Sequence, residues 1–162
     1  MKQPLASVWY NKSMKVVNRK FHRKYKEIEK YEAGIMLTGA EVKSVRAGNI
    51  RLEDSFVHIL GSEAYLINAD VPIYQFARPQ GYDSRRSRKL LLHKKELLRL
   101  KVKMAAASGL TVAPVSCYNK GALIKLEIAL VKGRREVEKK KLVKERDIKR
   151  DQEREAKEYL KV

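Results

Sequence analysis

The feature that most constrains this chain is the alternation of apolar and charged side chains over 124–128, within the apolar segment 122–131. The alternating residues are Ile124, Leu126, Ile128 and Leu130 on one side and Lys125 and Glu127 on the other. Because successive side chains of a strand point to opposite faces, this period of two predicts a half-buried β-strand. The apolar run 111–118, joined to it by Asn119-Lys120-Gly121, predicts a neighbouring strand.

Three further strands and two helices are predicted upstream of this pair. Residues 25–37 form one strand, and the runs 56–60 and 64–68 around Gly61-Ser62 form a hairpin, since Gly tolerates the positive φ of a tight turn. Thr38 and Glu41 have the spacing of a capping box, which predicts a helix over 39–47 that Gly48 ends. A second helix is predicted over 93–108.

An irregular segment separates the predicted hairpin from the second helix. Pro72, Pro79 and Gly81 predict a loop over about 72–83. The loop leads into five residues that carry four positive charges, RRSRK (85–89), and these are followed directly by three leucines. We expect an abrupt step here from the protein surface into the core.

The last 31 residues differ in character from the rest of the chain. Residues 132–162 hold 13 Lys and Arg against 8 Asp and Glu, and their few apolar residues form no continuous stripe. Three Glu–Lys pairs, beginning at Glu136, Glu145 and Glu153, have the favourable i, i+4 order, but each contributes only ~0.2–0.5 kcal/mol. We expect a helix-prone tail that is largely unfolded alone and orders against a partner.

These elements together predict a mainly β fold. Roughly six strands without βαβ units favour a small antiparallel, OB-like barrel with about three short helices and a basic, helix-prone C-terminal tail. We divide the chain into an N-terminal arm, 1–14, expected to be disordered, a barrel domain, 15–133, and the tail, 134–162. No symmetric apolar patch typical of a stable dimer is visible, so a monomer is expected.

The charge of the chain points to a polyanionic partner. The formal net charge is +18, from 37 Lys and Arg against 19 Asp and Glu. Nucleic acid is the first candidate and an anionic membrane surface the second. No run approaches the ~20 apolar residues of a spanning helix, and the N-terminus carries no apolar run followed by a cleavage site. With Cys117 as the single cysteine, we expect a cytoplasmic protein that binds RNA or DNA and no membrane.

The sequence offers little for catalysis. A phosphate-cradling GxxxxGK[ST] loop is absent, and His22, His58 and His93 are far apart without cysteines at metal-ligand spacing. Cys117 is expected in the core, and Glu53-Asp54 reads as a solvated turn rather than a nuclease metal site. We therefore expect no catalytic residue, no metal and no cofactor.

Six segments, in order along the chain, resemble one family. They are NRK (18–20), YEAG (31–34), GAEVKSVRAG (39–48), DSF (54–56), RKLLL (88–92) and KGRR (132–135). Together they resemble small protein B, also called the SsrA-binding protein, over about residues 16–150. The combination of segment 32–48 with the RKLLL run is the most specific part of the likeness.

The resemblance implies an OB-like barrel that binds the tRNA-like domain of transfer-messenger RNA. In this family, elongation factor Tu with GTP delivers the complex, through the RNA, to ribosomes stalled without a codon in the A site. The basic tail then enters the empty messenger channel of the small subunit, near its decoding region. This process, trans-translation, rescues the ribosome and tags the nascent peptide for degradation.

The resemblance and the charge pattern nominate RNA-binding residues. Asn18, Glu32 and Leu91 match family positions that contact or support the RNA. Among the basic residues, Lys43, Arg46 and the run near residue 88 are the best candidates for phosphate contacts, of which about half should touch RNA. The full predicted set is Asn18, Lys20, His22, Glu32, Lys43, Arg46, Arg85, Arg86, Arg88, Lys89 and Leu91.

Each nomination has a plainer alternative. Asn18 has the residue type of a helix cap, Glu32 fits a cross-strand ion pair, and Leu91 alone reads as a core residue. If Glu32 acts on RNA, it accepts hydrogen bonds from base or ribose groups, or it orients a neighbouring Lys or Arg, because a carboxylate cannot attract phosphate. His22 could stack on a splayed base.

The tail supplies the predicted ribosome contacts. They are Lys132, Arg134, Arg135, Lys139, Lys140, Lys141, Lys144, Arg146, Lys149 and Arg150. The sequence departs from the family here, because Glu138-Lys139-Lys140 replaces the usual Asp-Lys-Arg and Val137 replaces a preceding His or Tyr. An aromatic side chain that could stack on a ribosomal base is thus missing.

Two other functions fit the composition. A structural ribosomal protein or general RNA chaperone would have the same charge and a similar basic tail. A metal-dependent nuclease acting on RNA would need several convergent carboxylates, which the low acid content of the barrel region disfavours.

Overall fold

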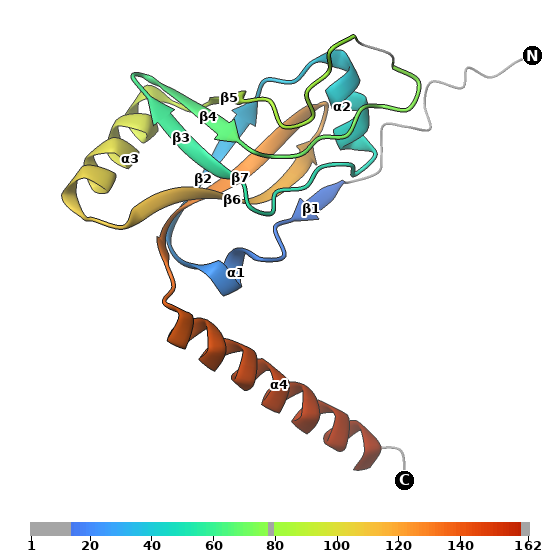
Figure 1. The fold of residues 1–162 in the computed structure, drawn as a ribbon, viewed down its shortest axis with the longest axis vertical. Helices are drawn as coiled ribbons and strands as arrows, with labels where there is room; N and C mark the ends of the chain where they lie inside the picture. Colours follow the sequence, from blue (N-terminus) through green and yellow to red (C-terminus); the bar gives the residue numbers. More distant parts are fainter. Residues whose placement is uncertain (1–13, 78–79, 160–162) are drawn as a thin grey trace, which may run out of the picture.

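The computed structural model describes residues 14–77 and 80–159. Its strands are β1 (Lys15–Val17), β2 (Tyr25–Ile35), β3 (Phe56–Leu60), β4 (Glu63–Ile67), β5 (Arg88–Leu91), β6 (Leu110–Lys120) and β7 (Leu123–Gly133). Neighbours pair in the order β1-β6-β3-β4-β5-β2-β7, every pair is antiparallel, and β6 also pairs with β7. The β6–β7 pairing closes six strands into a ring, with β1 attached outside it (Figure 1). The predicted mainly antiparallel β fold is confirmed.

The alternation in β7 is explained by burial on the inside of this ring. Ile124, Leu126, Ile128 and Leu130 belong to the main apolar core, whereas Lys125 and Glu127 are half-buried on the other face. The alternation stops at Ala129, because a second small cluster covers that part of the outer face. Phe21, only 1% exposed, packs there against Ala113, Val115, Ala129 and Val131.

Four helices accompany the strands in the described residues: α1 (Phe21–Lys24), α2 (Gly39–Arg46), α3 (Lys94–Ala106) and α4 (Glu136–Tyr159). The predicted capping box at α2 is present. The Thr38 backbone N–H donates to Glu41 Oε2 at 2.8 Å, and Thr38 Oγ1 accepts from the Glu41 N–H at 3.4 Å. Helices α2 and α3 lie at opposite ends of the barrel, and α4 projects away from it (Figure 1).

Sequence reasoning missed three short elements, β1, α1 and β5. Each is only three or four residues long, so neither the hydrophobic period of a helix nor that of a strand could be recognised in it. Strand β5 lies where a step into the core was predicted, and it joins β4 to β2. Residues 1–13 of the predicted arm lie outside the described residues, and Met14 is buried against the core. The tail is helical here, in keeping with its propensity, and its ordering on binding stays a prediction.

Candidate nucleic-acid interface

Glu32 organises a polar network at one end of the β6–β7 hairpin. Its carboxylate, on β2, accepts a hydrogen bond from the Tyr118 hydroxyl and one from Lys120 Nζ at 3.2 Å, and Lys125 Nζ lies 3.8 Å away. The hydrogen bond from Tyr118, and next the one from Lys120, lower the pKa of Glu32. The same bond from Tyr118 raises the pKa of that phenol to about 12. The predicted cross-strand ion pair is therefore present, and it brings two lysines together beside Glu32.

Tyr118, Lys120 and Lys125 were not among the predicted site residues. Lys125 carried a signal, since it lies on the polar face of the alternating strand. Its closeness to Glu32 depends on the register between β2 and β7, in which Lys125 lies opposite Gly34. Strand register between segments ninety residues apart is not visible in a single sequence.

Helix α2 brings its two exposed basic residues to the same end of the barrel. Arg46 Nη2 donates to the carbonyl of Ala122, in the β6–β7 turn, at 2.9 Å. Lys43 Nζ lies 5.6 Å from the centroid of the Tyr74 ring. The predicted contact residues Lys43, Arg46 and Glu32 thus share one end of the barrel.

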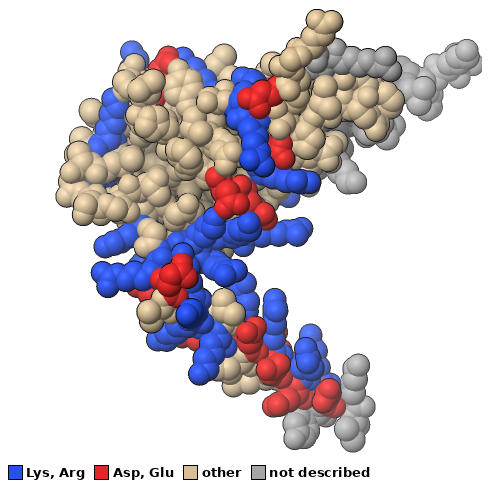
Figure 2. All heavy atoms as spheres, viewed as in Figure 1, with Lys and Arg blue, Asp and Glu red and all other residues tan. Residues whose placement is uncertain are grey.

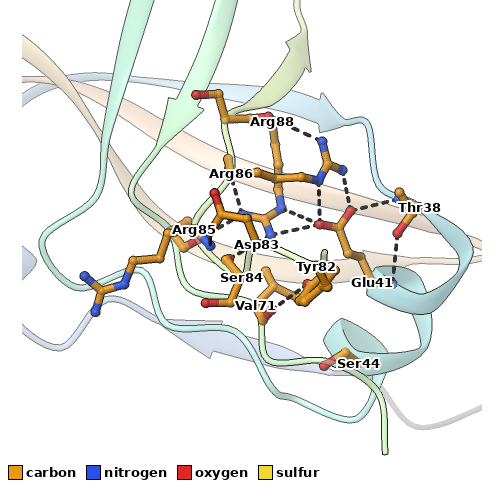
Figure 3. Close-up of polar contacts among 12 residues, drawn as sticks. Thr38, Glu41, Ser44, Val71, Tyr82, Asp83, Ser84, Arg85, Arg86 and Arg88 are labelled. Carbon is orange, nitrogen blue, oxygen red and sulfur yellow. Dashed lines mark hydrogen bonds and ion pairs between the residues drawn. The ribbon is translucent and has the colours of Figure 1, made fainter. Parts of the chain in front are cut away.

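A buried cluster around Glu41 fixes α2 to the segment before β5 (Figure 3). Arg88 donates to Glu41 Oε1 from Nε at 3.0 Å and from Nη2 at 2.8 Å, and to the carbonyls of Ala69, Ser84 and Arg86. Burial alone would raise the pKa of Glu41, but hydrogen bonds from Arg86 and the Thr38 N–H, together with the Arg88 charge, lower it to about 2. Both the Glu41 and the Arg88 side chains are completely inaccessible.

The prediction that Arg88 contacts phosphate is therefore wrong. Its guanidinium is fully buried, and Glu41 and three carbonyls occupy its donors. Arg86 is partly exposed, but its Nε and Nη2 also bind Glu41. Arg85 is exposed, and its side chain points away from the cluster (Figure 3). Of the three arginines, Arg85 is the one best placed for phosphate.

Lys89 and Leu91 lie on β5. The Lys89 ammonium binds the carboxylate of Glu63 on the neighbouring strand. Leu91 is 54% exposed, so the reading of Leu91 as a core residue is wrong. Gly34 accommodates it, since a Cβ at position 34 would lie 3.2 Å from the Leu91 Cβ. The exposed position agrees with a role at the surface, and the contact with RNA stays a prediction.

The side chain of Asn18 is buried and hydrogen-bonded to the backbone of two distant segments. Its side chain, in a residue only 4% exposed, donates to the carbonyls of Leu52 at 3.2 Å and Pro114 at 3.0 Å. Its Oδ1 accepts from the Lys20 N–H at 3.2 Å, at the entry to α1. Both amide hydrogens are thus occupied by backbone carbonyls. The N-cap residue of α1 is Lys20, so the alternative reading of Asn18 as a helix cap is wrong. A contact of Asn18 with RNA stays a prediction.

The other N-terminal candidates lie around α1. Lys20 Nζ lies 3.3 Å from Asp54 Oδ2 and 3.7 Å from Glu53 Oε2, and Lys24 also binds Asp54. His22 is exposed, and its ring meets Phe21 edge-on. Glu53 and Asp54 thus neutralise part of the positive charge of the basic N-terminal segment.

The predicted tail residues follow the end of β7. Arg134 Nε donates to the carbonyls of His22 and Tyr25 at 3.2 and 3.1 Å, which fixes the exit of the tail beside α1. Lys and Arg side chains gather where α4 leaves the barrel and continue along the helix (Figure 2). Val137, which replaces the family's aromatic residue, is 79% exposed.

The part of the chain that the structure describes holds neither a metal-binding cluster nor a membrane-spanning helix. No group of three or more His, Cys, Asp or Glu side chains there could hold a metal ion. No helix among these residues is both long and apolar enough to cross a membrane. Cys117 is buried, and burial raises the pKa of its thiol to about 12.

Comparisons with known proteins point to a single family. The family model described as SmpB protein matches residues 15–158. The SsrA-binding protein of Sulfurihydrogenibium sp. (strain YO3AOP1) is 48% identical and covers 93% of this chain and 99% of its own. That of Persephonella marina is 46% identical, covering 83% and 88%. A solved structure described as "tmRNA-SmpB: a journey to the center of the bacterial ribosome" is 40% identical, with a TM-score of 0.62 over 75% of this chain and 85% of that one. This chain belongs to the SmpB family of SsrA-binding proteins.

Proposed function

We propose that this protein binds the tRNA-like domain of transfer-messenger RNA and acts as the adaptor of trans-translation on stalled ribosomes. The observation that carries the proposal is that one family model matches residues 15–158, a range that includes both the barrel and nearly all of α4. Two relatives named SsrA-binding protein cover 93% and 83% of the chain. The cations held by Glu32 and those of α2 give the barrel a surface suited to an RNA backbone.

The tail is proposed to act on the ribosome. Helix α4 projects from the barrel and carries its cations on exposed side chains, which suits a narrow channel lined with RNA phosphate (Figures 1 and 2). In this proposal α4 enters the empty messenger channel of the small subunit. Elongation factor Tu with GTP is a partner of the complex and contacts it through the RNA. Action on ribosomes implies a cytoplasmic protein.

No catalytic step is part of this proposal. SmpB is an RNA-binding family rather than an enzyme family. Incubating the pure protein with RNA and Mg²⁺ or Mn²⁺ tests this directly. Intact RNA is the expected result, and cleavage would favour the nuclease alternative.

The decisive experiment is a titration of labelled transfer-messenger RNA and ordinary tRNA of similar length at several salt concentrations. The two RNAs carry similar phosphate charge, so non-specific attraction treats them alike. We expect a preference of at least tenfold for transfer-messenger RNA, about 1.4 kcal/mol, that persists at high salt. Equal affinities that fall together as salt rises would contradict the proposal and favour a general RNA chaperone.

A further inference from the structure

A pair of aromatic rings stands on the loop after β4, outside every segment that carries the family resemblance. The rings of Tyr74 and Phe76 meet edge-on with centroids 5.5 Å apart. A turn closed by a hydrogen bond from the Ala77 N–H to the Tyr74 carbonyl, at 2.8 Å, projects Phe76 outward. Phe76 is 76% exposed. A single exposed ring is ordinary on a protein surface, but an ordered pair beside a cation is less so.

The pair is continuous with the basic end of the barrel. Lys43 lies over the Tyr74 ring, and no carboxylate of the described residues lies within ion-pair distance of its ammonium. One turn further along α2, Arg46 binds the β6–β7 turn, beside the lysines that Glu32 holds. Aromatic rings, Lys43, Arg46 and the Glu32 network therefore form one connected surface.

The loop that carries the rings is anchored at both ends. Ser44 Oγ, on α2, donates to the Pro72 carbonyl at 2.6 Å, and the Tyr82 hydroxyl donates to the Val71 carbonyl at 2.6 Å. The Val71 N–H donates to the Ser84 carbonyl at 3.0 Å, next to the Glu41 cluster (Figure 3). Because both ends of the loop are held, less conformational entropy is lost when a partner stacks on Phe76.

We propose that Phe76, supported by Tyr74, is a stacking site for an unpaired base of the RNA, and that Lys43 neutralises the adjoining phosphate. The choice of RNA rests on the proposed function. The chemistry fits it, since single-stranded nucleotides bind where an exposed aromatic face stands next to a positive charge. Stacking tolerates any base, so the site adds affinity for an unpaired loop rather than a sequence preference.

The test is the affinity of the full-length protein for transfer-messenger RNA. Phe76→Ala is expected to weaken binding by about 5-fold to about 150-fold, the range of one base–aromatic stack. Phe76→Trp is expected to retain binding, and Phe76→Leu to lose it, because leucine is apolar but has no π face. Leu60→Ala is the matched control, since Leu60 is 65% exposed and lies on β3, away from this surface.

Salt dependence separates the two parts of the site. Phe76→Ala should lower affinity without changing the slope of log K against log salt, because it removes no charge. Lys43→Gln should reduce that slope by about 0.7, the contribution of one phosphate contact in a single strand. Ultraviolet crosslinking of the wild-type complex, read by mass spectrometry, should recover an RNA-linked peptide containing Tyr74 or Phe76.

The outcomes are distinct. If wild-type protein shows no preference for transfer-messenger RNA over tRNA, the proposed function fails. If the preference is present but Phe76→Ala binds like wild type and the crosslink is absent, the stacking site alone is overturned. Full binding of the RNA by Phe76→Leu would also overturn it, since an apolar contact without a π face would then suffice. A fall in affinity as large for Leu60→Ala would mean that Phe76 has no special role.

Discussion

The carboxylate of Glu41 and the guanidinium of Arg88 form an ion pair, with Nη2 2.8 Å from Oε1, in which neither side chain has any exposed surface. The same carboxylate caps α2 through the Thr38 N–H and also binds Arg86. One buried anion thus holds α2 to the end of the 71–88 segment. Its partners are complete, so the cost of removing two charges from water is offset by ion pairing and hydrogen bonds.

Glu41→Gln should strongly destabilise the protein. The substitution leaves the buried Arg88 charge without its counter-ion, which typically costs ~3–5 kcal/mol of unfolding free energy. Urea denaturation measures this. Glu63→Gln is the control, because it breaks a solvent-exposed pair with Lys89, which should contribute much less to stability than the buried pair. Equal losses in the two variants would contradict a special role for the Glu41 cluster.

The Glu41 cluster should make stability fall in acid. The pKa of Glu41 is about 2 in the folded protein, below its ordinary value of 4.5. Above pH 4.5 the carboxyl is ionised in both states and its contribution is complete. Between pH 4.5 and 2 only the unfolded chain takes up the proton, so on the order of 3 kcal/mol is lost as the pH falls.

Comparing urea midpoints of wild-type and Glu41→Gln proteins across this pH range isolates that contribution. Other carboxyl groups with lowered pKa values, such as Glu29 and Asp54, act equally in both proteins. The stability difference between the two proteins should shrink toward pH 2. A difference that stays constant with pH would show that the pKa of Glu41 is not lowered by folding.

Glu32→Gln should weaken binding of transfer-messenger RNA by about tenfold. The variant keeps an acceptor for Tyr118 but loses the negative charge that positions Lys120 and Lys125 for the RNA backbone. Glu29→Gln is the matched control on the same strand, since Glu29 pairs with Lys103 and Arg99 of α3 instead. Gel-shift or anisotropy titrations measure both affinities. An equal loss of affinity in the two variants would argue against a role for the Glu32 network.

Deleting residues 136–162 should separate RNA binding from ribosome rescue. The deleted segment holds ten Lys and Arg against eight Asp and Glu, so its removal changes net charge little. We expect affinity for transfer-messenger RNA to stay within about threefold, while tagging of stalled peptides in a translation extract is lost. Loss of RNA affinity on deletion would show that the barrel is not the main binding unit.

Local signals in the sequence predicted the elements that are long or strongly patterned. The alternation of β7 and the Thr38–Glu41 capping box depend on residues close together in the chain, and both are present. The family segments likewise identified the RNA-binding class. Short elements escaped prediction. Helix α1, for example, is four residues long and is stabilised by the packing of Phe21 on β6 and β7.

By itself, the sequence determined where strands alternate, where α2 begins and that the partner is a polyanion, because these follow from spacing and charge. Tertiary structure decided which of several similar side chains is available to that partner. Arg85 and Arg88 look alike in the sequence, yet only Arg88 faces Glu41, which is 47 residues away and brought near by the packing of α2 beside β5. Burial and pairing of a charge depend on such distant neighbours, and a one-dimensional pattern does not contain them.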